Sequence, residues 1–389
     1  MNLFSKEEIE NTLLKLDEWK KQNKSIIIVA DIGGTNTRIC FTFLESKIGD
    51  FLIMPYKKIN SSRKVVELFQ QLSESIQNKF KIHAGVIATG GRVLENGTIG
   101  YVTNFPLPEE NQKMILKELP SNLFPEKNSI FINDLEGCCF GLLFLNQNKH
   151  LNQFYQPLWK GKEIILEDNS EIVFNKSNIL VLGMGTGFGV GLMLYSGYDS
   201  KYYVIPTEFG HSIINLKNIE TDKNQFELIN YISNQKYQGK HSIEYGDICS
   251  GPGLVMCYNY LVQKMGLKLE PIDAATISKK SMIDEPKDEY SEVCKQAQTI
   301  HYNFLFRLAS NLCVSLQCKT IFLVLDNQVK NDKFVTSKIQ EFHHNFLDHP
   351  KNNWLIDVNC FRQISADENL NITFMGCLHF SQQFFSKQN

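Results

Sequence analysis

The hydrophobic positions of the chain follow two spacings, one typical of helices and one typical of buried strands. Apolar residues recur at helical spacing through 3–22, which predicts a leading helix, and the run SIIIVA at 25–30 predicts a buried strand. The same criteria predict strands at 37–44, 50–55, 82–88 and 129–132, and helices at 63–79, 110–120 and 135–145. Strands and helices therefore alternate along the first part of the chain, as in an α/β protein.

A polar, irregular connection at 146–178, in which we expect a hairpin, separates this part from a second alternation of strands and helices. The second alternation has predicted strands at 179–182, 188–195 and 320–325, and helices at 224–235, 253–265, 291–317 and after Phe374. Each half opens with a hairpin whose turn contains glycine and threonine, which indicates a duplicated α/β architecture. In such a protein we expect the ligand in the cleft between two domains.

Length and charge narrow the class of protein. A chain of 389 residues is too long for one ordinary core, so two domains are expected. The net charge of −2 favours neither a nucleic-acid partner nor an acidic membrane surface. No apolar run approaches the roughly 20 residues of a membrane helix, and the N-terminus lacks a signal-peptide pattern. The ten cysteines form no C-x-x-C pair. We therefore expect a cytoplasmic protein with reduced, buried thiols.

The first candidate site follows the strand at 25–30, where Asp31 precedes Gly33, Gly34, Thr35 and Asn36. Glycine lets backbone N–H groups approach an anion closely. A carboxylate beside such a turn suits Mg²⁺, held directly or through water. The segment therefore suits phosphate and metal binding, although an ordinary hairpin turn with a polar tip has the same composition.

The second candidate site contains glycine at every second position from Gly183 to Gly191. Alternate side chains of a strand share one face, so one face of this hairpin is bare backbone. Glycine weakens a strand, and close approach of a phosphate explains the row better than close packing of another backbone. The Rossmann fingerprint is not met because Phe188 replaces its third glycine, and Walker A and protein-kinase signatures are absent.

A third candidate site lies where the strand at 129–132 ends and a helix begins, at Asn133 and Asp134. An aspartate at this position can simply cap the helix. Phosphoryl transfer to an alcohol, however, needs a carboxylate that orients the hydroxyl group and accepts its proton. Asn133 offers a hydrogen bond to a second hydroxyl group. Both interpretations of Asp134 stay open at this point.

Two further segments carry polar groups suited to a small ligand. Glu208 and His211 stand three residues apart around a glycine, and together they suit two neighbouring hydroxyl groups. A zinc half-site is the alternative, but no credible third ligand accompanies them. Ser250 and Gly251 open a helix whose N–H groups and dipole suit an anion, and a plain helix cap is the alternative there.

Six motifs in a fixed order resemble the bacterial-type glucokinase family, within the hexokinase, actin and Hsp70 ATPase superfamily. In this chain they read D-x-G-G-T-N, T-N-F-P (103–106), I-N-D, G-x-G-T-G-x-G-V, E-x-G-H and S-G-P-G-L. The resemblance implies a two-domain ribonuclease H-like (actin-like ATPase) hexokinase fold, with a small and a large α/β domain and a cleft between them. We place the small domain at 1–134 and the large domain at 135–389, and we expect the C-terminal helix to pack back on the small domain.

The resemblance also implies an activity and a role for each motif. The family transfers the γ-phosphoryl group of ATP to the 6-hydroxyl of D-glucose with Mg²⁺, the first step of glycolysis, and is often dimeric. The residues that match its sugar-binding positions are Asn104, Asn133, Asp134, Glu208 and His211, with Asp134 at the position of the general base. The residues that match its phosphate, magnesium and nucleotide segments are Asp31, Gly33, Gly34, Thr35, Asn36, Gly185, Thr186, Gly187, Ser250 and Gly251.

The chain departs from the family pattern at three places. The family has a further sugar-binding glutamate that aligns with Gly246 here, and we expect Glu244, two residues earlier, to replace it. The family's diglycine near the adenosine is Asp326-Asn327 in this chain, which affects nucleotide choice. Phe209 stands at a glycine of the family's E-G-G-H motif, where its bulk is expected to narrow the sugar pocket.

Three alternatives to a glucokinase follow from the same residues. One is a kinase for another hexose or an amino sugar such as glucosamine. Another is a sugar-sensing relative without turnover, although only one helix precedes the first strand and the chain lacks a basic patch for DNA. The third is an actin-like ATPase, which has no need of the sugar-binding set. The presence of Asp134 favours catalysis.

Overall fold

A computed structural model describes residues 3–47, 50–77, 79–214, 223–283, 288–365 and 371–386. The chain divides into two compact units, unit 1 (Met1–Leu151 with Ala366–Asn389) and unit 2 (Asn152–Ser365). The boundary predicted from the sequence follows residue 134, the first residue of α3 (Asp134–Gln147), whereas the division of the structure lies after α3. The difference arises because α3 packs along the C-terminal helix α12 (Ile372–Phe384), which also belongs to unit 1.

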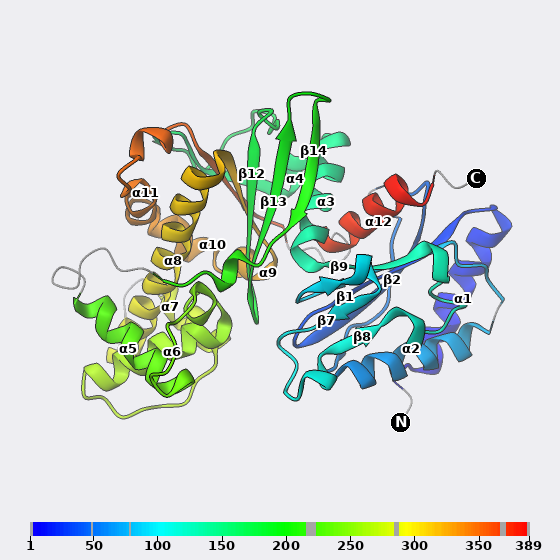
Figure 1. Ribbon diagram of the computed structural model, residues 1–389, viewed down its shortest axis with the longest axis horizontal. Coiled ribbons are helices and arrows are strands. Elements are labelled where there is room, and N and C mark those ends of the chain that lie inside the picture. Colours follow the sequence, from blue (N-terminus) through cyan, green and yellow to red (C-terminus); the bar gives the residue numbers. More distant parts are fainter. Residues whose placement is uncertain are drawn as a thin grey trace. The chain divides into compact units, whose positions relative to one another are not determined.

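The main sheet of unit 1 has the strand order β3-β2-β1-β5-β9, with β4 paired to β2 (Figure 1). Its strands are β1 (Ile26–Ile32), β2 (Asn36–Phe43), β3 (Leu52–Ile53), β4 (Lys57–Lys58), β5 (Ala84–Thr89) and β9 (Ser129–Asn133). Strands β1, β5 and β9 are parallel, and β2 is antiparallel to β1. The register places Ile32 beside Thr89 and Thr89 beside Asn133. The carboxyl ends of three strands, each followed by a candidate segment, therefore meet at one edge of the sheet.

Helices cover both faces of this sheet, which explains why all seven residues of β1 are buried. The core on one face includes side chains of α1 (Lys6–Lys21) and α2 (Ser62–Ile76), among them Trp19 and Phe69. The helix α1 begins where Ser5 and Glu8 form a capping box. Helix α12 contacts β5, β1 and β2, so it covers the sheet together with α3.

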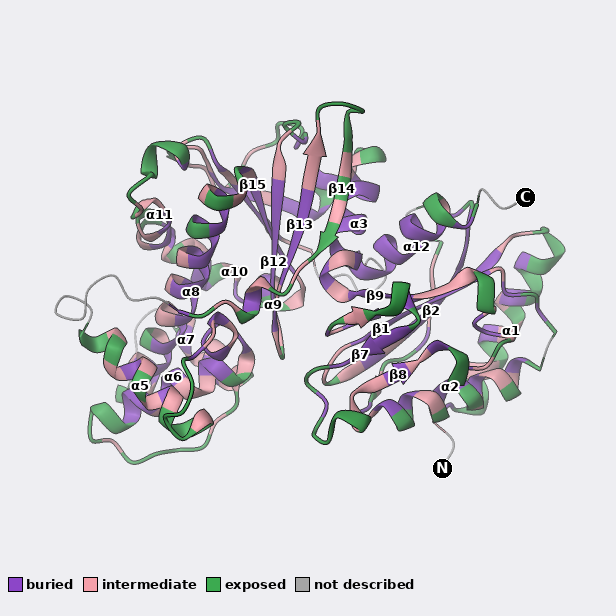
Figure 2. Ribbon diagram, viewed as in Figure 1, coloured by how far each residue is buried: buried purple, intermediate pink, exposed green. Residues whose placement is uncertain are grey.

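The helices α3 and α12 lie against one another along buried faces (Figures 1 and 2). Glycines permit this approach. A Cβ atom added to Gly376 would lie 1.7 Å from the carbonyl oxygen of Gly137 and 2.8 Å from the amide nitrogen of Gly141. Since no Cβ atom can occupy that space, the packing of α12 on α3 requires glycine at position 376.

A small antiparallel sheet replaces the helix that the sequence predicted at 110–120. It contains β6 (Val93–Leu94), β7 (Ile99–Tyr101) and β8 (Lys113–Ile115), and short 3-10 turns flank β8. The helix prediction was wrong because Met114 and Leu116 are buried at the two-residue spacing of an extended chain, which pairs with β7.

The sheet of unit 2 has the strand order β11-β10-β16-β15-β12-β13-β14. Its strands are β10 (Tyr155–Lys160), β11 (Glu163–Ile164), β12 (Asn178–Met184), β13 (Phe188–Ser196), β14 (Lys201–Pro206), β15 (Cys318–Val324) and β16 (Asn359–Gln363). The hairpin expected within 146–178 is confirmed as β10–β11, but β10 also joins the sheet by pairing with β16, about 200 residues later. The edge strand β14 is largely exposed, whereas β12 is almost fully buried (Figure 2).

The helices of unit 2 are α4 (Leu151–Phe154, beginning at the last residue of unit 1), α5 (Lys223–Tyr237), α6 (Gly251–Lys264), α7 (Ala274–Ser281), α8 (Glu289–Leu316), α9 (Asp326–Lys330), α10 (Asp332–Ser337) and α11 (Ile339–Leu347). The long helix α8 packs against α6, α7, α11 and β15. Large buried rings, including Trp159, Tyr302 and Phe342, fill this core. All ten cysteines are buried and free, as expected.

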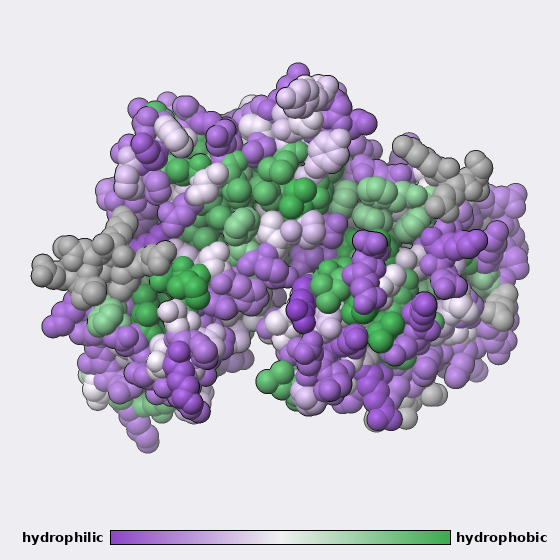
Figure 3. Space-filling model, viewed as in Figure 1, coloured by the Kyte–Doolittle hydropathy of each residue, from purple (hydrophilic) through white to green (hydrophobic). Residues whose placement is uncertain are grey.

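No helix of the described ranges is long and apolar enough to cross a membrane. Hydrophilic side chains predominate on the face drawn in Figure 3, although apolar side chains also gather on it. Among the exposed large apolar side chains are Tyr198 and Tyr203, beside or within the edge strand β14.

Two buried histidines predict how stability depends on pH. His301 in α8 donates from Nδ1 to the carbonyl oxygen of Ile248 at 2.7 Å, and burial lowers the pKa of His301 to about 4. Burial also lowers the pKa of His379 in α12 to about 4. Below about pH 6.5 the unfolded chain takes up protons that the folded chain does not, so stability falls as the pH falls. At pH 5 we expect each histidine to have lowered the free energy of unfolding by about 2 kcal/mol relative to pH 7.

Urea unfolding at pH 7 and pH 5 measures this effect. His301→Gln should reduce the loss of stability between the two pH values, while the same change at the exposed His241 should leave it unaltered. Equal stability of the unmodified protein at both pH values contradicts the prediction.

Candidate active site

Asp134 lies at the carboxyl edge of the main sheet of unit 1, in the first turn of α3 directly after β9. A Cβ atom added to Gly90 would lie 3.4 Å from Asp134 Oδ2 and 3.8 Å from Gly33 Cα. The loops after β1, β5 and β9 therefore meet around this carboxylate. Asp134 is partly exposed, so a ligand at the edge of the sheet can reach it.

The cap of α3 is Asn133, which settles one question that the sequence left open. Its Oδ1 accepts hydrogen bonds from the backbone N–H groups of Leu135 (2.9 Å) and Glu136 (3.4 Å), and its Nδ2 donates to the carbonyl oxygen of Gly91 at 3.1 Å. The Glu136 carboxylate completes a capping box, and burial raises its pKa. Asn133 is buried and thus holds the loop after β5 against the helix that carries Asp134.

Asn104 lies in an exposed turn that is fastened to the same edge. The N–H group of Thr103 donates to the carbonyl oxygen of Gly90 at 3.1 Å. The side chain of Gln112 donates to the carbonyl oxygens of Thr103 and Phe105, on both sides of Asn104. A Cβ atom on Gly91 would lie 2.5 Å from Thr103 Oγ1, so glycine is required for this close contact.

Asp31 forms an ion pair that sequence analysis missed. Arg38 Nη1 donates to Asp31 Oδ2 at 3.1 Å, and the Asp31 side chain is 12% exposed. The pair follows from the hairpin, whose register places residue 31 opposite residue 38. Counting across the turn at 33–36 could have found Arg38, since it occupies the position directly across the strand pair. The Asp31 carboxylate is therefore fixed in place at the end of β1.

At Gly33 and Gly185, neither close packing within the protein nor the backbone angle φ requires glycine. A Cβ atom on Gly185 would meet nothing closer than 4.0 Å, and one on Gly33 nothing closer than 3.6 Å. Neither residue has the positive φ that favours glycine. Glycine therefore leaves open space beside the backbone at both turns. In the first turn, Thr35 is exposed, and the buried Oδ1 atom of Asn36 has no hydrogen-bond partner among the residues that the structure describes.

The second turn is held by the start of α6. Gly185 donates its N–H to the carbonyl oxygen of Gly187, and the N–H of Gly251 donates to the carbonyl oxygen of Gly185, both at 2.8 Å. The Oγ atom of Ser250 accepts from the N–H of Gly253 at 3.2 Å and caps the helix. The N–H groups of Gly251 and Gly253, at the start of α6, are thus used within the chain. Gly251 fixes the turn, whose tip, Thr186, is exposed.

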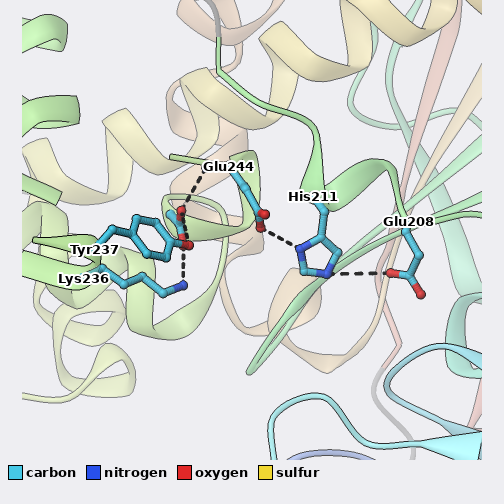
Figure 4. Close-up of polar contacts among 6 residues, drawn as sticks. Glu208, His211, Lys236, Tyr237 and Glu244 are labelled. Atoms are coloured by element: carbon cyan, nitrogen blue, oxygen red, sulfur yellow. Dashed lines mark hydrogen bonds and ion pairs between the residues drawn. The ribbon is translucent and has the colours of Figure 1, made fainter. Parts of the chain in front are cut away.

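Glu208, His211 and Glu244 lie together in unit 2 (Figure 4). His211 Nδ1 is 2.6 Å from Glu244 Oε2, and His211 Nε2 is 3.8 Å from Glu208 Oε2. The side chains of Glu208 and His211 are each 52% exposed, and that of Glu244 is 30% exposed. This accessible row of two carboxylates and an imidazole offers acceptors and donors to the hydroxyl groups of a polyol.

Backbone contacts fix the positions of these three residues. A Cβ atom on Gly210 would lie 2.1 Å from the carbonyl oxygen of Phe188, so the 3-10 turn Phe209–His211 packs directly on the start of β13. Ile213 and Glu244 form an antiparallel bridge. A Cβ atom on Gly246, where the family has its glutamate, would lie 3.4 Å from the carbonyl oxygen of Gly210. Glu244 is thus the residue of this segment that brings a carboxylate to His211, on the side opposite Glu208.

The other two departures from the family pattern also have structural counterparts. Phe209 is partly buried and packs against the hydrophobic core of unit 2. Leu325, directly before Asp326 and Asn327, has a φ of 80°, a conformation that favours glycine. Its N–H donates to Gln363 Oε1 at 2.9 Å, which holds the backbone there. Asp326 and Asn327 themselves begin α9.

The described residues contain no group of three or more histidines, cysteines, aspartates or glutamates placed to hold a metal ion. A pocket of about 840 Å³ lies on unit 2 between α5, α6 and α8, with Lys264, Lys295 and Phe304 among its lining residues. It contains none of the residues predicted from the sequence motifs.

A family model, a relative by sequence and a solved structure similar to this chain are all described as glucokinases. The model of the glucokinase family matches residues 28–324. The protein named "Probable glucokinase 2" of Trichomonas vaginalis is 31% identical over 385 residues, covering 96% of this chain and 97% of that protein. The crystal structure of Balamuthia mandrillaris glucokinase in complex with glucose is 31% identical, with a TM-score of 0.86 over 96% of this chain and 99% of that one.

A more distant structure shares the fold alone. The ROK family glucokinase of Streptomyces griseus, solved in complex with glucose and AMPPNP, is 12% identical, with a TM-score of 0.61 over 92% of this chain and 99% of that one. The expected α/β fold of the actin-like ATPases and hexokinases is thereby confirmed.

Proposed function

This chain belongs to the glucokinase family, and on that premise we propose that it transfers the γ-phosphoryl group of ATP to the 6-hydroxyl of D-glucose. The products are glucose 6-phosphate and ADP, so the reaction is the first step of glycolysis. The observation that carries the proposal is the accessible row of Glu208, His211 and Glu244 in unit 2 (Figure 4). The Balamuthia relative, 31% identical, binds glucose.

Unit 2 supplies the residues that recognise the sugar. Carboxylate oxygens accept hydrogen bonds from hydroxyl groups, and each carboxylate has several lone pairs to offer. One oxygen of Glu244 already contacts His211, so the imidazole and the carboxylate present a fixed pair of groups to two neighbouring hydroxyls. Such a pair discriminates strongly against a sugar that lacks or inverts a hydroxyl group, because the polar groups are then left unpaired.

Unit 1 supplies the general base. Asp134 accepts the proton of the 6-hydroxyl while the new bond forms between that oxygen and the γ-phosphorus, and the bond from the γ-phosphorus to the leaving oxygen of ADP breaks. Asn133 positions Asp134, because it caps the helix that carries the carboxylate. Asn104, in the exposed turn fastened to Gly90, adds a donor and an acceptor for the sugar.

The two glycine turns are proposed to bind the phosphates. Gly33 and Gly185 leave space beside the backbone that no side chain of the described residues fills, which suits a close approach of phosphate oxygens. Thr35 and Thr186 are exposed at the tips of these turns. Gly251 contributes by holding the second turn, and Ser250 by capping the helix that begins there.

The magnesium ion that the family implies fits Asp31. A single carboxylate suits Mg²⁺, which is usually held by one or two carboxylates together with phosphates and water. The orphaned Oδ1 of Asn36 adds an acceptor for a bound water in the same turn. The ion would neutralise charge on the transferred phosphoryl group. The Arg38 guanidinium keeps the Asp31 carboxylate in place for that contact.

A coupled assay with glucose, glucosamine, fructose, galactose and mannose tests the substrate. We expect turnover with ATP to be fastest on glucose, by about 10–100-fold in kcat/KM over sugars that invert or lack a hydroxyl group, because one unpaired buried polar group costs about 1–3 kcal/mol. Excess EDTA should abolish the turnover, and added Mg²⁺ should restore it.

Faster turnover on glucosamine or another hexose identifies the alternative kinase. Absence of turnover on every sugar, with glucose still bound in calorimetry, identifies a sugar-sensing relative. We further propose a cytoplasmic homodimer, on the resemblance to the family alone, and light scattering on the purified protein tests the dimer.

A further inference from the structure

A buried carboxylate lies directly behind the proposed sugar-binding residues. Asp247 ends the 3-10 turn Tyr245–Asp247, and its side chain is 1% exposed. A buried charge is costly unless it is paired and hydrogen-bonded. Asp247 meets this requirement through Lys236 and Tyr237, the last two residues of α5 (Figure 4). Lys236 Nζ donates to Asp247 Oδ1, and the Tyr237 hydroxyl lies 3.2 Å from Oδ1 and 3.0 Å from Oδ2.

The fourth contact of Asp247 reaches the sugar-binding residue. Asp247 Oδ2 accepts a hydrogen bond from the backbone N–H of Glu244 at 2.9 Å. The side chain of Glu244 in turn contacts His211 at 2.6 Å. A continuous series of polar contacts thus leads from α5 through Asp247 and Glu244 to His211.

The surroundings of Lys236 favour its charged form. Burial alone lowers the pKa of Lys236, but the hydrogen bond and the negative charge of Asp247 raise it above the ordinary value of a lysine. Lys236 thus remains a cation at neutral pH and compensates the buried carboxylate. Its ammonium group also lies over the ring of Tyr237, 5.2 Å from the centroid.

We infer that Asp247, held by Lys236 and Tyr237, is a positioning residue that orients Glu244 for the sugar. The inference rests on the proposed function, because it assigns Glu244 to glucose binding. It also explains how this chain can place a carboxylate beside His211 although it has glycine at position 246, where the family has its glutamate. The carboxylate has moved two residues earlier, and Asp247 anchors the backbone of Glu244 in the place where that carboxylate reaches His211.

Steady-state kinetics of Asp247→Asn test the inference. Asparagine keeps the shape and one acceptor oxygen but removes the charge that holds Lys236. We expect KM for glucose to rise about tenfold, as when one hydrogen bond to a charged group is lost, while KM for ATP and kcat change less than about twofold. Tyr237→Phe is the milder second variant, with an expected rise of about threefold in KM for glucose.

A matched control lies elsewhere in unit 2. Lys264, Glu227 and Tyr260 form a similar trio, with Lys264 Nζ 2.8 Å from Glu227 Oε2 and 3.1 Å from the Tyr260 hydroxyl. Glu227→Gln should leave both KM values unaltered, because the hydrogen bonds of this trio join its members to one another and to Asn224.

A double-mutant cycle separates positioning from a merely structural role. In the Glu244→Gln background, adding Asp247→Asn should raise KM for glucose by less than about twofold, because the residue that it positions is already impaired. The inference is overturned if the two changes are fully additive in KM for glucose and if Asp247→Asn also lowers the thermal stability and raises KM for ATP.

Other outcomes distinguish this inference from the proposed function. An unmodified chain that phosphorylates glucose, with KM for glucose unchanged in both Asp247→Asn and Tyr237→Phe, overturns the inference alone. A chain that binds glucose in calorimetry without turnover contradicts the proposed reaction, and the same variants then test the inference through the Kd for glucose. Absence of both binding and turnover overturns the two together.

Discussion

Asp134→Asn is expected to lower kcat for glucose phosphorylation by about 10²–10⁴-fold, the usual contribution of a general base. The carboxamide cannot accept the proton of the 6-hydroxyl. The change should leave the fold intact, because asparagine keeps an acceptor for the N–H of Leu135, which contacts Asp134 Oδ1 at 2.8 Å. The cap of α3 is Asn133, so the helix does not depend on the charge at 134. Initial rates at saturating glucose and ATP measure the effect.

Asp273→Asn provides a matched control. Asp273 is also an aspartate at the start of a helix, where it caps α7 by accepting from the N–H of Thr276 at 2.8 Å. Because Asp273 is exposed and belongs to none of the candidate segments, kcat should stay near that of the unmodified protein. KM values for glucose and ATP in Asp134→Asn should remain within a few-fold. Near-normal turnover in Asp134→Asn would remove this residue from the mechanism.

Gly376→Ala is expected to destabilise unit 1 by about 2–4 kcal/mol, since overpacking a well-packed core is among the larger effects of single substitutions. The new methyl group would lie 1.7 Å from the carbonyl oxygen of Gly137. That atom belongs to the backbone of α3 and cannot move alone, so α12 must shift away from α3. Urea unfolding followed by circular dichroism measures the loss of stability.

Gly197→Ala is the control for this prediction. A Cβ atom at position 197 has no neighbour within 4 Å, so alanine there should change the free energy of unfolding by less than about 0.5 kcal/mol. If Gly376→Ala unfolds with the same free energy as the unmodified protein, then α12 can move away from α3 without loss of stability, and the prediction is wrong. A loss of activity in Gly376→Ala is also expected, because α3 carries Asp134.

The secondary structure followed from the sequence wherever the local pattern decided it. The strands β1, β5, β9, β12 and β15 were predicted because each is a short apolar run buried on both faces. The helix predicted at 110–120 and the missed strand β16 are different. Their conformation depends on pairing with β7 and β15, and the alternation within so short a segment does not by itself distinguish a strand from a helix.

The candidate site was predicted from motifs, and the structure distributed the roles among them. The motif I-N-D contains two polar residues, either of which could cap the following helix, and in the structure the cap is Asn133. Ser250 and Gly251 were expected to face an anion; in the structure Ser250 caps α6, and the N–H group of Gly251 donates to Gly185 in the second turn. The residue type shows that a side chain can form hydrogen bonds, but the partner that it binds depends on which backbone groups the fold places beside it.

The sequence by itself determined the family, the α/β class and the segments that carry chemistry, because these follow from local periodicity and from the order of short motifs. Only the tertiary structure decided which carboxylate meets His211, since Glu244 lies 33 residues from His211. It likewise decided that Lys236, Tyr237 and Asp247 stand behind Glu244, and that α12 needs glycine beside Gly137. These contacts join segments far apart in the chain, and their geometry arises only when both segments are packed against the same core.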